Sequence, residues 1–175
     1  AVSTNRLWTL NNGTISNDGT GALTLTGNID LTGTGASLGG SYTGADNTVS
    51  GIIAGTGALT SNGAATWLLT GANTRSGAIN VHNGTLRAGN AAAFGTTTGI
   101  TIDNGTLDLN GFALETTTLA GNGGTLALGN ANLTFNAGTG VTTSYAGTIT
   151  GTGGIIKLGA STQTLTGSNQ YTGDT

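Results

Sequence analysis

The chain has 175 residues and a net charge of −3, and it contains 34 Gly and 37 Thr but no Pro, Cys or Met. Only 6% of its residues are charged, and the basic ones are too scattered to form the positive face that nucleic-acid binding needs. No apolar run approaches the ~18 residues that would span a bilayer, and the absence of Cys excludes disulfides and thiolate metal sites. The length suits a single domain.

The N-terminal part carries short runs in which Thr and apolar residues alternate. Residues 19–33, for example, read GTGALTLTGNIDLTG. Pairs of Thr separated by one residue are expected to share a strand face, and they occur at Thr24/Thr26, Thr32/Thr34, Thr148/Thr150 and Thr164/Thr166. Some ice-binding proteins are solenoids, in which the chain winds into stacked coils and successive coils carry a flat array of such pairs. Ice binding is therefore one function to consider for this chain. The pairs are absent from residues 57–95, and Thr is also simply a good strand former.

A long repeat begins at residue 51. Residues 51–77 read GIIAGTGALTSNGAATWLLTGANTRSG, and residues 147–173 read GTITGTGGIIKLGASTQTLTGSNQYTG. The two stretches align without gaps at an offset of 96, and 13 of the 27 positions are identical. A chain that is merely rich in Gly and Thr would rarely match itself at one fixed offset, without gaps, over 27 positions. If the repeats stack as the coils of a solenoid, as the shorter repeat described next predicts, Trp67 in the first stretch is expected to cap the solenoid or to pack at its wall.

A shorter repeat follows. Residues 79–90 (INVHNGTLRAGN) align with residues 100–111 (ITIDNGTLDLNG), so that Leu86 falls on Leu107, and a looser third copy surrounds Leu126. Apolar and polar residues alternate in each copy, which predicts strands with one buried face. Recurrence near 20 residues, with several strands per copy, predicts an all-β parallel β-solenoid of about 20–25 residues per coil across residues 1–175. Gly and Asn would form the corners, and Asn side chains would stack in ladders.

Residues 91–94 (AAAF) interrupt this alternation. We expect an outward loop or a single helical turn that widens one coil, and loops of this kind are where solenoids place binding specificity. This segment, within residues 91–99, is therefore the first candidate for a contact surface. The remaining aromatic residues are too few and too scattered to indicate a sugar-binding platform.

The stretch from Leu69 to Gly77 (LTGANTRSG), running on to Asn83-Gly84-Thr85-Leu86, resembles the autotransporter-associated β-strand repeat of type V secreted proteins. Residues 165–173 (LTGSNQYTG) resemble the start of a second copy, and the resemblance covers residues 51–88 and 147–175. Tyr171 supplies the aromatic residue that the family usually has before Thr-Gly, whereas Arg75-Ser76 departs from that pattern.

The resemblance implies a right-handed parallel β-helix from the passenger of a Gram-negative autotransporter, secreted or displayed at the cell surface. The implied partners are flanking passenger coils and a C-terminal outer-membrane β-barrel of the same parent chain, together with receptors on host or bacterial surfaces. The implied role is a non-enzymatic stalk that supports secretion and display, and the alternative is an adhesin module.

Few residues suggest chemistry. His82 should lie over Asp103 on the next coil, where a His–carboxylate pair could orient a general base but is expected to be an ordinary stacked surface pair. Arg87 should lie over Asp108 as an ion pair between coils. A glycosidase or lyase would need two acids about 5–10 Å apart, and the only local concentration is Asp103, Asp108 and Glu115. The glycine strings at 123–126 and 153–156 lack the Asp of calcium-binding β-rolls. We therefore expect no catalytic residue, no metal site and no cofactor, and the sequence names no binding residue.

Neither end of the chain looks like a cap. An open solenoid end exposes unpaired strand edges, and the sequence begins AVSTNRLWTL, without Met, and finishes QYTGDT inside a repeat. These features predict a fragment of a longer passenger, or end-to-end association between copies.

Overall fold

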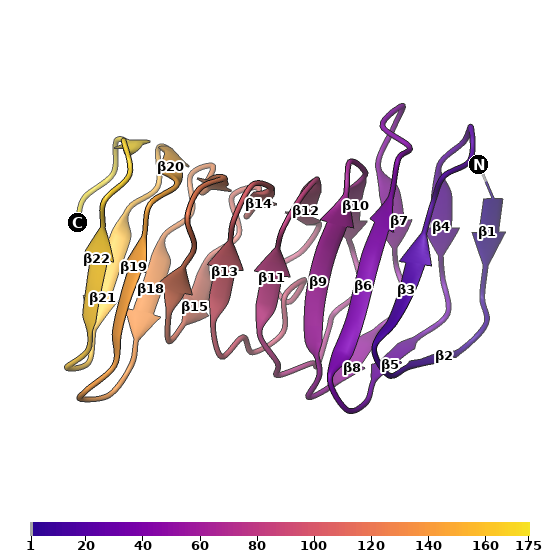
Figure 1. Cartoon of the computed structure of the whole chain (residues 1–175), viewed down its shortest axis with the longest axis horizontal. Coiled ribbons are helices and arrows are strands. Elements are labelled where there is room, and N and C mark those ends of the chain that lie inside the picture. Colours follow the sequence, from indigo (N-terminus) through magenta and orange to yellow (C-terminus); the bar gives the residue numbers. More distant parts are fainter. Residues whose placement is uncertain (1) are drawn as a thin grey trace.

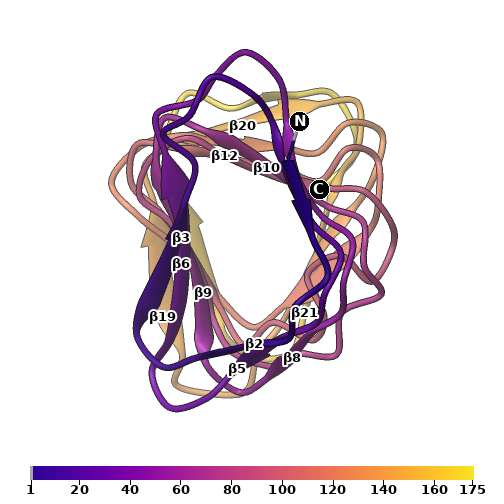
Figure 2. The same cartoon turned by 90° about the vertical axis from the view of Figure 1, so that its right-hand side faces the viewer.

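The computed structural model describes residues 2–175, and within that range the chain consists of short strands joined by turns. Every strand pairing is parallel, and the chain winds as a β-solenoid of about eight coils (Figure 1). Seen from the N-terminal end, the chain runs clockwise as it recedes, so the solenoid is right-handed (Figure 2). The predicted right-handed parallel β-helix is therefore confirmed.

Each coil contributes strands to as many as three faces. The first face is one nine-stranded sheet composed of β1 (Val2–Thr4), β4 (Leu23–Leu25), β7 (Asn47–Val49), β10 (Thr66–Leu69), β12 (Thr85–Ala88), β14 (Thr106–Asp108), β17 (Thr125–Ala127), β20 (Thr148–Gly151) and β23 (Gln170–Tyr171). The second face is split into two sheets, one of β2 (Trp8–Leu10), β5 (Ile29–Leu31) and β8 (Ile53–Gly55), the other of β15 (Leu114–Thr116), β18 (Leu133–Asn136) and β21 (Ile155–Leu158).

The third face begins as a six-stranded sheet and continues as a pair of strands. It contains β3 (Gly13–Ser16), β6 (Gly35–Gly40), β9 (Ala58–Gly63), β11 (Ile79–Val81), β13 (Ile100–Ile102) and β16 (Leu119–Ala120), then β19 (Thr142–Tyr145) and β22 (Thr162–Leu165). A parallel bridge from Gly121 to Tyr145 joins the two parts. The coils differ in length, since the step from Thr66 to its stacked partner Thr85 is shorter than the step from Thr24 to Thr48.

The core is a column of apolar side chains along the axis of the solenoid. Leu86 pairs with Leu107, and Leu107 pairs with Leu126, as the short repeat predicts. All three side chains are fully buried, and full burial of one Leu contributes roughly 1.5–3 kcal/mol. The alternating polar residues of the same strands point outward. The sequence period thus sets the vertical stacking, because a slip of one residue would turn every Leu to solvent.

The second face is interrupted in the middle of the solenoid. Between β8 and β15, two successive coils pass this side through residues 70–78 and 89–99 without forming a strand. The segment 91–94 is a tight turn in which the N–H of Ala93 donates to the carbonyl of Asn90 at 3.1 Å. Ala93 and Phe94 are buried, so the outward loop is wrong, and of the two predicted forms the single turn is the nearer one, although it packs inward. Of its four residues, only Ala91 is exposed.

The two copies of the long repeat occupy different faces. In the first copy, β8, β9 and β10 belong to the second, third and first face, whereas the corresponding β20, β21 and β22 belong to the first, second and third. Four coils after Trp67, the stacked residue is Ile149 on the first face. The repeat instead aligns Trp67 with Gln163, which lies on the third face. The offset of the repeat is therefore not a whole number of coils, and the second copy is turned back by one face.

Local contacts are nevertheless the same in both copies. The N–H of Thr70 donates to Val49 and that of Thr166 to Tyr145, both at 2.9 Å. At the same corner, a Cβ on Gly71 would lie 2.2 Å from the carbonyl oxygen of Gly51 on the coil below, and a Cβ on Gly167 would meet Gly147 in the same way. The Leu-Thr-Gly motif therefore encodes a corner geometry that does not depend on which corner of the solenoid it forms.

One expectation about the Thr pairs is wrong, and one of the two alternatives for Trp67 is correct. Three of the four Thr pairs do not share a strand face, because Thr26 and Thr166 lie at corners just beyond their strands and Thr32/Thr34 lie between strands; only Thr148/Thr150 lie together, on β20. Trp67 does not cap the solenoid but packs on the inner side of its wall, on β10. Its side chain is fully buried in the interior, and its indole N–H donates to the carbonyl of Gly39 at 3.1 Å.

Candidate functional site

The interruption of the second face contains two buried polar side chains, Asn73 and Arg75. Asn73 is 5% exposed and links three coils. Its Oδ1 accepts from the N–H of Ile53 at 2.7 Å, and its Nδ2 donates to the carbonyl of Ala93 at 2.5 Å. The predicted Asn ladders thus take a different form here, since this side chain bonds to main chain above and below. Among the Asn residues that the structure describes, only Asn17 and Asn47 bond to each other through their side chains, at 2.6 Å.

Arg75 is fully buried beside Asn73, although the sequence had marked it only as a departure from the family pattern. Its Nη1 donates to the carbonyl of Phe94 at 3.0 Å, and its Nη2 donates to Ala78 at 2.6 Å and to Gly57 at 3.4 Å. These carbonyls belong to three successive coils. The guanidinium therefore replaces strand pairing where the second face is missing.

Burial lowers the pKa of Arg75 to about 10, so the group is still charged at neutral pH. Its Nε has no hydrogen-bond partner, and its three contacts are all to main-chain carbonyls. A buried charge of this kind is costly unless its donors are satisfied. The arrangement holds coils together and offers no reactive group, because a protonated guanidinium neither accepts a proton nor acts as a nucleophile.

Arg87 is the centre of the main surface ion cluster. Its Nε lies 2.8 Å from Oδ2 of Asp108, as predicted, and its Nη1 lies 2.8 Å from Oδ2 of Asp46. The hydrogen bond to Asp108 and the charge of Asp46 raise the pKa of Arg87. The contact of Arg87 with Asp46 does not follow from the register of adjacent coils, because Asp46 lies two coils before Arg87 along the chain.

His82 and Asp103 form the predicted pair at a corner of the solenoid. The Nδ1 of His82 lies 2.8 Å from Oδ2 of Asp103, and the two side chains are 46% and 32% exposed. Within residues 2–175 neither side chain bonds to a further side chain. A general base needs a third group to orient it, or a nucleophile within reach, and the geometry here supplies only an exposed hydrogen-bonded pair.

The three clustered carboxylates have separate partners. Asp103 faces His82 and Asp108 faces Arg87, while Glu115 accepts a hydrogen bond from Nδ2 of Asn136 at 2.9 Å. In the part of the chain that the structure describes, no group of three or more His, Cys, Asp or Glu residues could hold a metal ion. The glycine strings at 123–126 and 153–156 belong to the corners and strands of ordinary coils.

A column of Thr runs along the first face. Five Thr side chains point outward on successive coils in register, namely Thr66, Thr85, Thr106, Thr125 and Thr148. The neighbouring column carries Leu68, Arg87, Asp108 and Ala127 at the same rungs, and along this described sheet a Thr pair occurs only on β20. A single column does not form the paired array that the ice-binding alternative requires.

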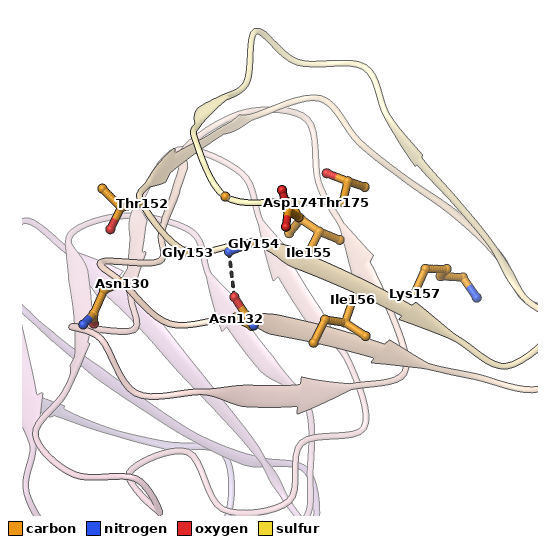
Figure 3. Close-up of a pocket in the computed structure, with 11 residues that line it drawn as sticks. Asn130, Asn132, Thr152, Gly153, Gly154, Ile155, Ile156, Lys157, Asp174 and Thr175 are labelled. Carbon is orange, nitrogen blue, oxygen red and sulfur yellow. Dashed lines mark hydrogen bonds between the residues drawn. The ribbon is translucent and has the colours of Figure 1, made fainter.

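A shallow hollow lies beside β21 near the C-terminal end (Figure 3). The N–H of Gly154 donates to Oδ1 of Asn132 in its wall at 2.8 Å (Figure 3). Lys157 points away, with its Nζ bonded to the carbonyl of Leu158 at 2.6 Å. The hollow therefore contains a single side-chain carboxylate, that of Asp174, and no acid–base pair.

Within residues 2–175, the chain forms no helix of the length and apolarity that crossing a membrane requires. The geometry of this range offers a rod with a buried polar clamp formed by Asn73 and Arg75, a surface ion cluster of Asp46, Arg87 and Asp108, and an uncharged Thr column.

Comparisons with known proteins agree with this description. The family model described as passenger-associated-transport-repeat matches residues 59–88 and 155–175. A curated relative, the adhesin BmaC autotransporter of Brucella suis biovar 1 (strain 1330), is 48% identical over 166 residues, or 94% of this chain. The chain spans only 5% of the length of that relative. No solved structure gives a significant match.

Proposed function

The chain matches the passenger-associated-transport-repeat model in two places and is homologous over most of its length to part of an autotransporter adhesin, and from this premise we propose that it is a mechanical segment of a surface passenger. Its rod would hold a binding region away from the outer membrane, and its repeats would help the chain to leave the cell. The observation that carries the proposal is the unbroken nine-stranded parallel sheet, in which each coil pairs only with its neighbours.

Nearest-neighbour stacking supplies the mechanism. A folded coil presents a row of unpaired strand edges, and the next ~20 residues to emerge bury their apolar side chains on it, so folding propagates along the rod. The contacts of the buried polar groups fit this scheme, because Asn73 and Arg75 bond to the coils directly before and after their own. Each completed coil would then oppose backward movement of the chain through an export pore.

The location and partners of the segment follow from the same premise. We place the parent protein at the surface of a Gram-negative bacterium, anchored by a C-terminal outer-membrane β-barrel, with further passenger coils beside this segment. A non-enzymatic role is supported by the relative, which is named an adhesin, and by the surface pairing of Asp103 with His82 and of Asp108 with Arg87.

The secretion role is tested by comparing a deletion that removes whole coils with a deletion that breaks the register of the coils. Val49, Leu69 and Ala88 are stacked on successive coils, so deleting residues 50–88 in a full-length autotransporter that carries this segment removes two whole coils. Deleting residues 50–81 instead joins the end of a first-face strand to the end of a third-face strand. We expect surface yield to be several-fold lower for the out-of-phase deletion, and equal yields would contradict the proposal.

The alternative is that the segment is itself an adhesin module, which the relative's name favours. The first face would be the contact surface, since it combines the Thr column with the cluster of Asp46, Arg87 and Asp108. Binding of this isolated segment to host or bacterial cells would support this alternative. Binding by a longer parent passenger but not by this segment would support the mechanical role.

A further inference from the structure

One step in the middle of the solenoid, from the coil of residues 79–99 to the coil of residues 100–118, is bonded unevenly. On the first face this step is closed by the pairing of β12 with β14, and on the third face by the pairing of β11 with β13. On the second face it has no strand pairing, because β15 pairs only with β18 on the coil above. The two coils are therefore joined along two faces and unjoined along the third.

The gap on the second face can be located in the main chain. Leu114 donates its N–H to the carbonyl of Asn132 on the coil above at 3.3 Å. Because alternate residues of a strand direct their main-chain groups to opposite edges, Glu115 directs its N–H and carbonyl to the coil below. In the described chain, no hydrogen bond joins residues 91–97 to residues 111–117, and a hollow of about 450 Å³ is lined by residues of both.

The bonds nearest to this gap hold each side of it separately. On the lower side, Asn73 and Arg75 bond to residues 53–57 and 92–94, and the N–H of Thr96 donates to the carbonyl of Arg75 at 2.9 Å. On the upper side, Glu115 accepts a hydrogen bond from Nδ2 of Asn136. The second face thus consists of a lower block, which ends with residues 89–99, and an upper block of β15, β18 and β21.

The opposite side of the same step is reinforced by side chains. Arg87 pairs with Asp108 on the first face, and His82 pairs with Asp103 at the corner between the third and first faces, each at 2.8 Å. Both pairs cross from the coil of residues 79–99 to the next. We propose that this step is a hinge, at which the lower and upper blocks separate on the second face while the corner at His82 and Asp103 stays closed.

Bending is easier at this step than at its neighbours. Opening the second face one step higher would break the pairing of β15 with β18, and opening it one step lower would break the buried bonds of Asn73 and Arg75 to the turn at residues 91–94. At the hinge, opening breaks no main-chain bond between residues 91–97 and 111–117 and enlarges a hollow that is already wide enough for water. The stacking of Leu86 on Leu107 continues across the step and limits the movement.

Distances between pairs of spin labels test the hinge. The chain contains no Cys, so two introduced Cys residues take both labels. Ala54→Cys with Thr134→Cys labels outward positions of β8 and β18 on either side of the hollow. Thr48→Cys with Ala127→Cys is the matched control, because it spans the same number of coil steps along the first face. We expect the distance distribution from pulsed electron paramagnetic resonance to be at least about twofold wider for the second-face pair.

Equal widths for the two pairs would overturn the proposal. Local unfolding of the second face would also widen the distribution, and backbone amide exchange of the unlabelled protein separates it from a hinge. With a hinge, the N–H groups of Thr96 and Leu114 stay protected, since each bonds within its own block, and the N–H of Glu115 exchanges at least about 100-fold faster than either. Equally fast exchange at all three positions would show a melted face, and equally slow exchange would show a bonded step; either result contradicts the hinge.

Discussion

The guanidinium of Arg75 donates to the carbonyl oxygen of Phe94, one coil further along the chain, at 3.0 Å inside a site that solvent does not reach. Arg75→Ala leaves the carbonyls of Phe94 and Gly57 without this donor and opens a cavity, while the carbonyl of Ala78 keeps its bond from the N–H of Leu59. Because each buried unsatisfied group costs about 1–3 kcal/mol, we expect the free energy of unfolding in urea to fall by roughly 3 kcal/mol or more. Arg6→Ala, at an exposed position, is the control and should change it little. A loss below about 1 kcal/mol at Arg75 would contradict the clamp.

Tyr145 is fully buried, and its hydroxyl has no hydrogen-bond partner. Tyr145→Phe removes that unsatisfied group, so we expect the variant to be more stable than the wild type by about 1 kcal/mol at neutral pH. A destabilised variant would show that the hydroxyl is satisfied in solution.

The same substitution should alter the pH dependence. Burial raises the pKa of Tyr145 from 10.0 to about 12, so the folded protein keeps the phenol proton where the unfolded chain loses it. The stabilising contribution of that proton is complete below the unfolded pKa and declines as the pH rises toward the folded pKa. The difference between Tyr145→Phe and the wild type, measured by urea unfolding, should grow over that range in favour of the variant. A constant difference would contradict the shift.

Gly71 tests the corner geometry, because a Cβ there would lie 2.2 Å from the carbonyl oxygen of Gly51. Moving the backbone to relieve such overpacking typically costs about 1–3 kcal/mol, and we expect that loss for Gly71→Ala in thermal or urea unfolding. Gly138 is a matched control, since a Cβ there meets nothing within 4 Å. Gly138→Ala should be within about 0.5 kcal/mol of the wild type. Equal effects at both positions would show that coil stacking does not require glycine at this corner.

Arg87 provides a test of surface electrostatics. Its side chain is 36% exposed, and exposed ion pairs contribute about 0–1 kcal/mol each. We expect Asp46→Asn and Asp108→Asn each to lower stability within that range, with the loss shrinking as NaCl is added because the pairs are screened. The double variant measures whether the two carboxylates act independently. A salt-independent loss of several kcal/mol would instead show that the cluster is desolvated.

His82→Ala should leave the free energy of unfolding within about 1 kcal/mol of the wild type, because both members of the pair with Asp103 are substantially exposed. Thermal unfolding of the variant and of Asp103→Asn gives the measurement. A loss of several kcal/mol from either change would assign the corner a buried or functional role.

The stacking of Leu86 on Leu107 was predictable because a parallel solenoid repeats its side-chain environment once per coil, so the sequence repeats with it. The pairs of His82 with Asp103 and Arg87 with Asp108 follow from the same register. Leu-Thr-Gly and Asn-Gly were also informative, since corners restrict the backbone more than strands do.

The buried role of Arg75 was not predictable in this way. An isolated Arg between polar residues is usually solvated, and its burial depends on the missing second-face strand and on the turn at residues 91–94. The Thr column was missed because its members are neighbours in space but lie a full coil apart in sequence, at spacings that vary from coil to coil. Searching within a strand for Thr pairs could not reveal it.

The offset between the two copies has a geometric consequence for any passenger built by duplicating this unit. Each duplicate is rotated about the long axis of the solenoid by one of its three faces, so a side chain copied with the unit points in a new direction in each duplicate. Successive units would therefore place a duplicated surface feature on each of the three faces in turn, so that the feature is accessible from every side of the solenoid.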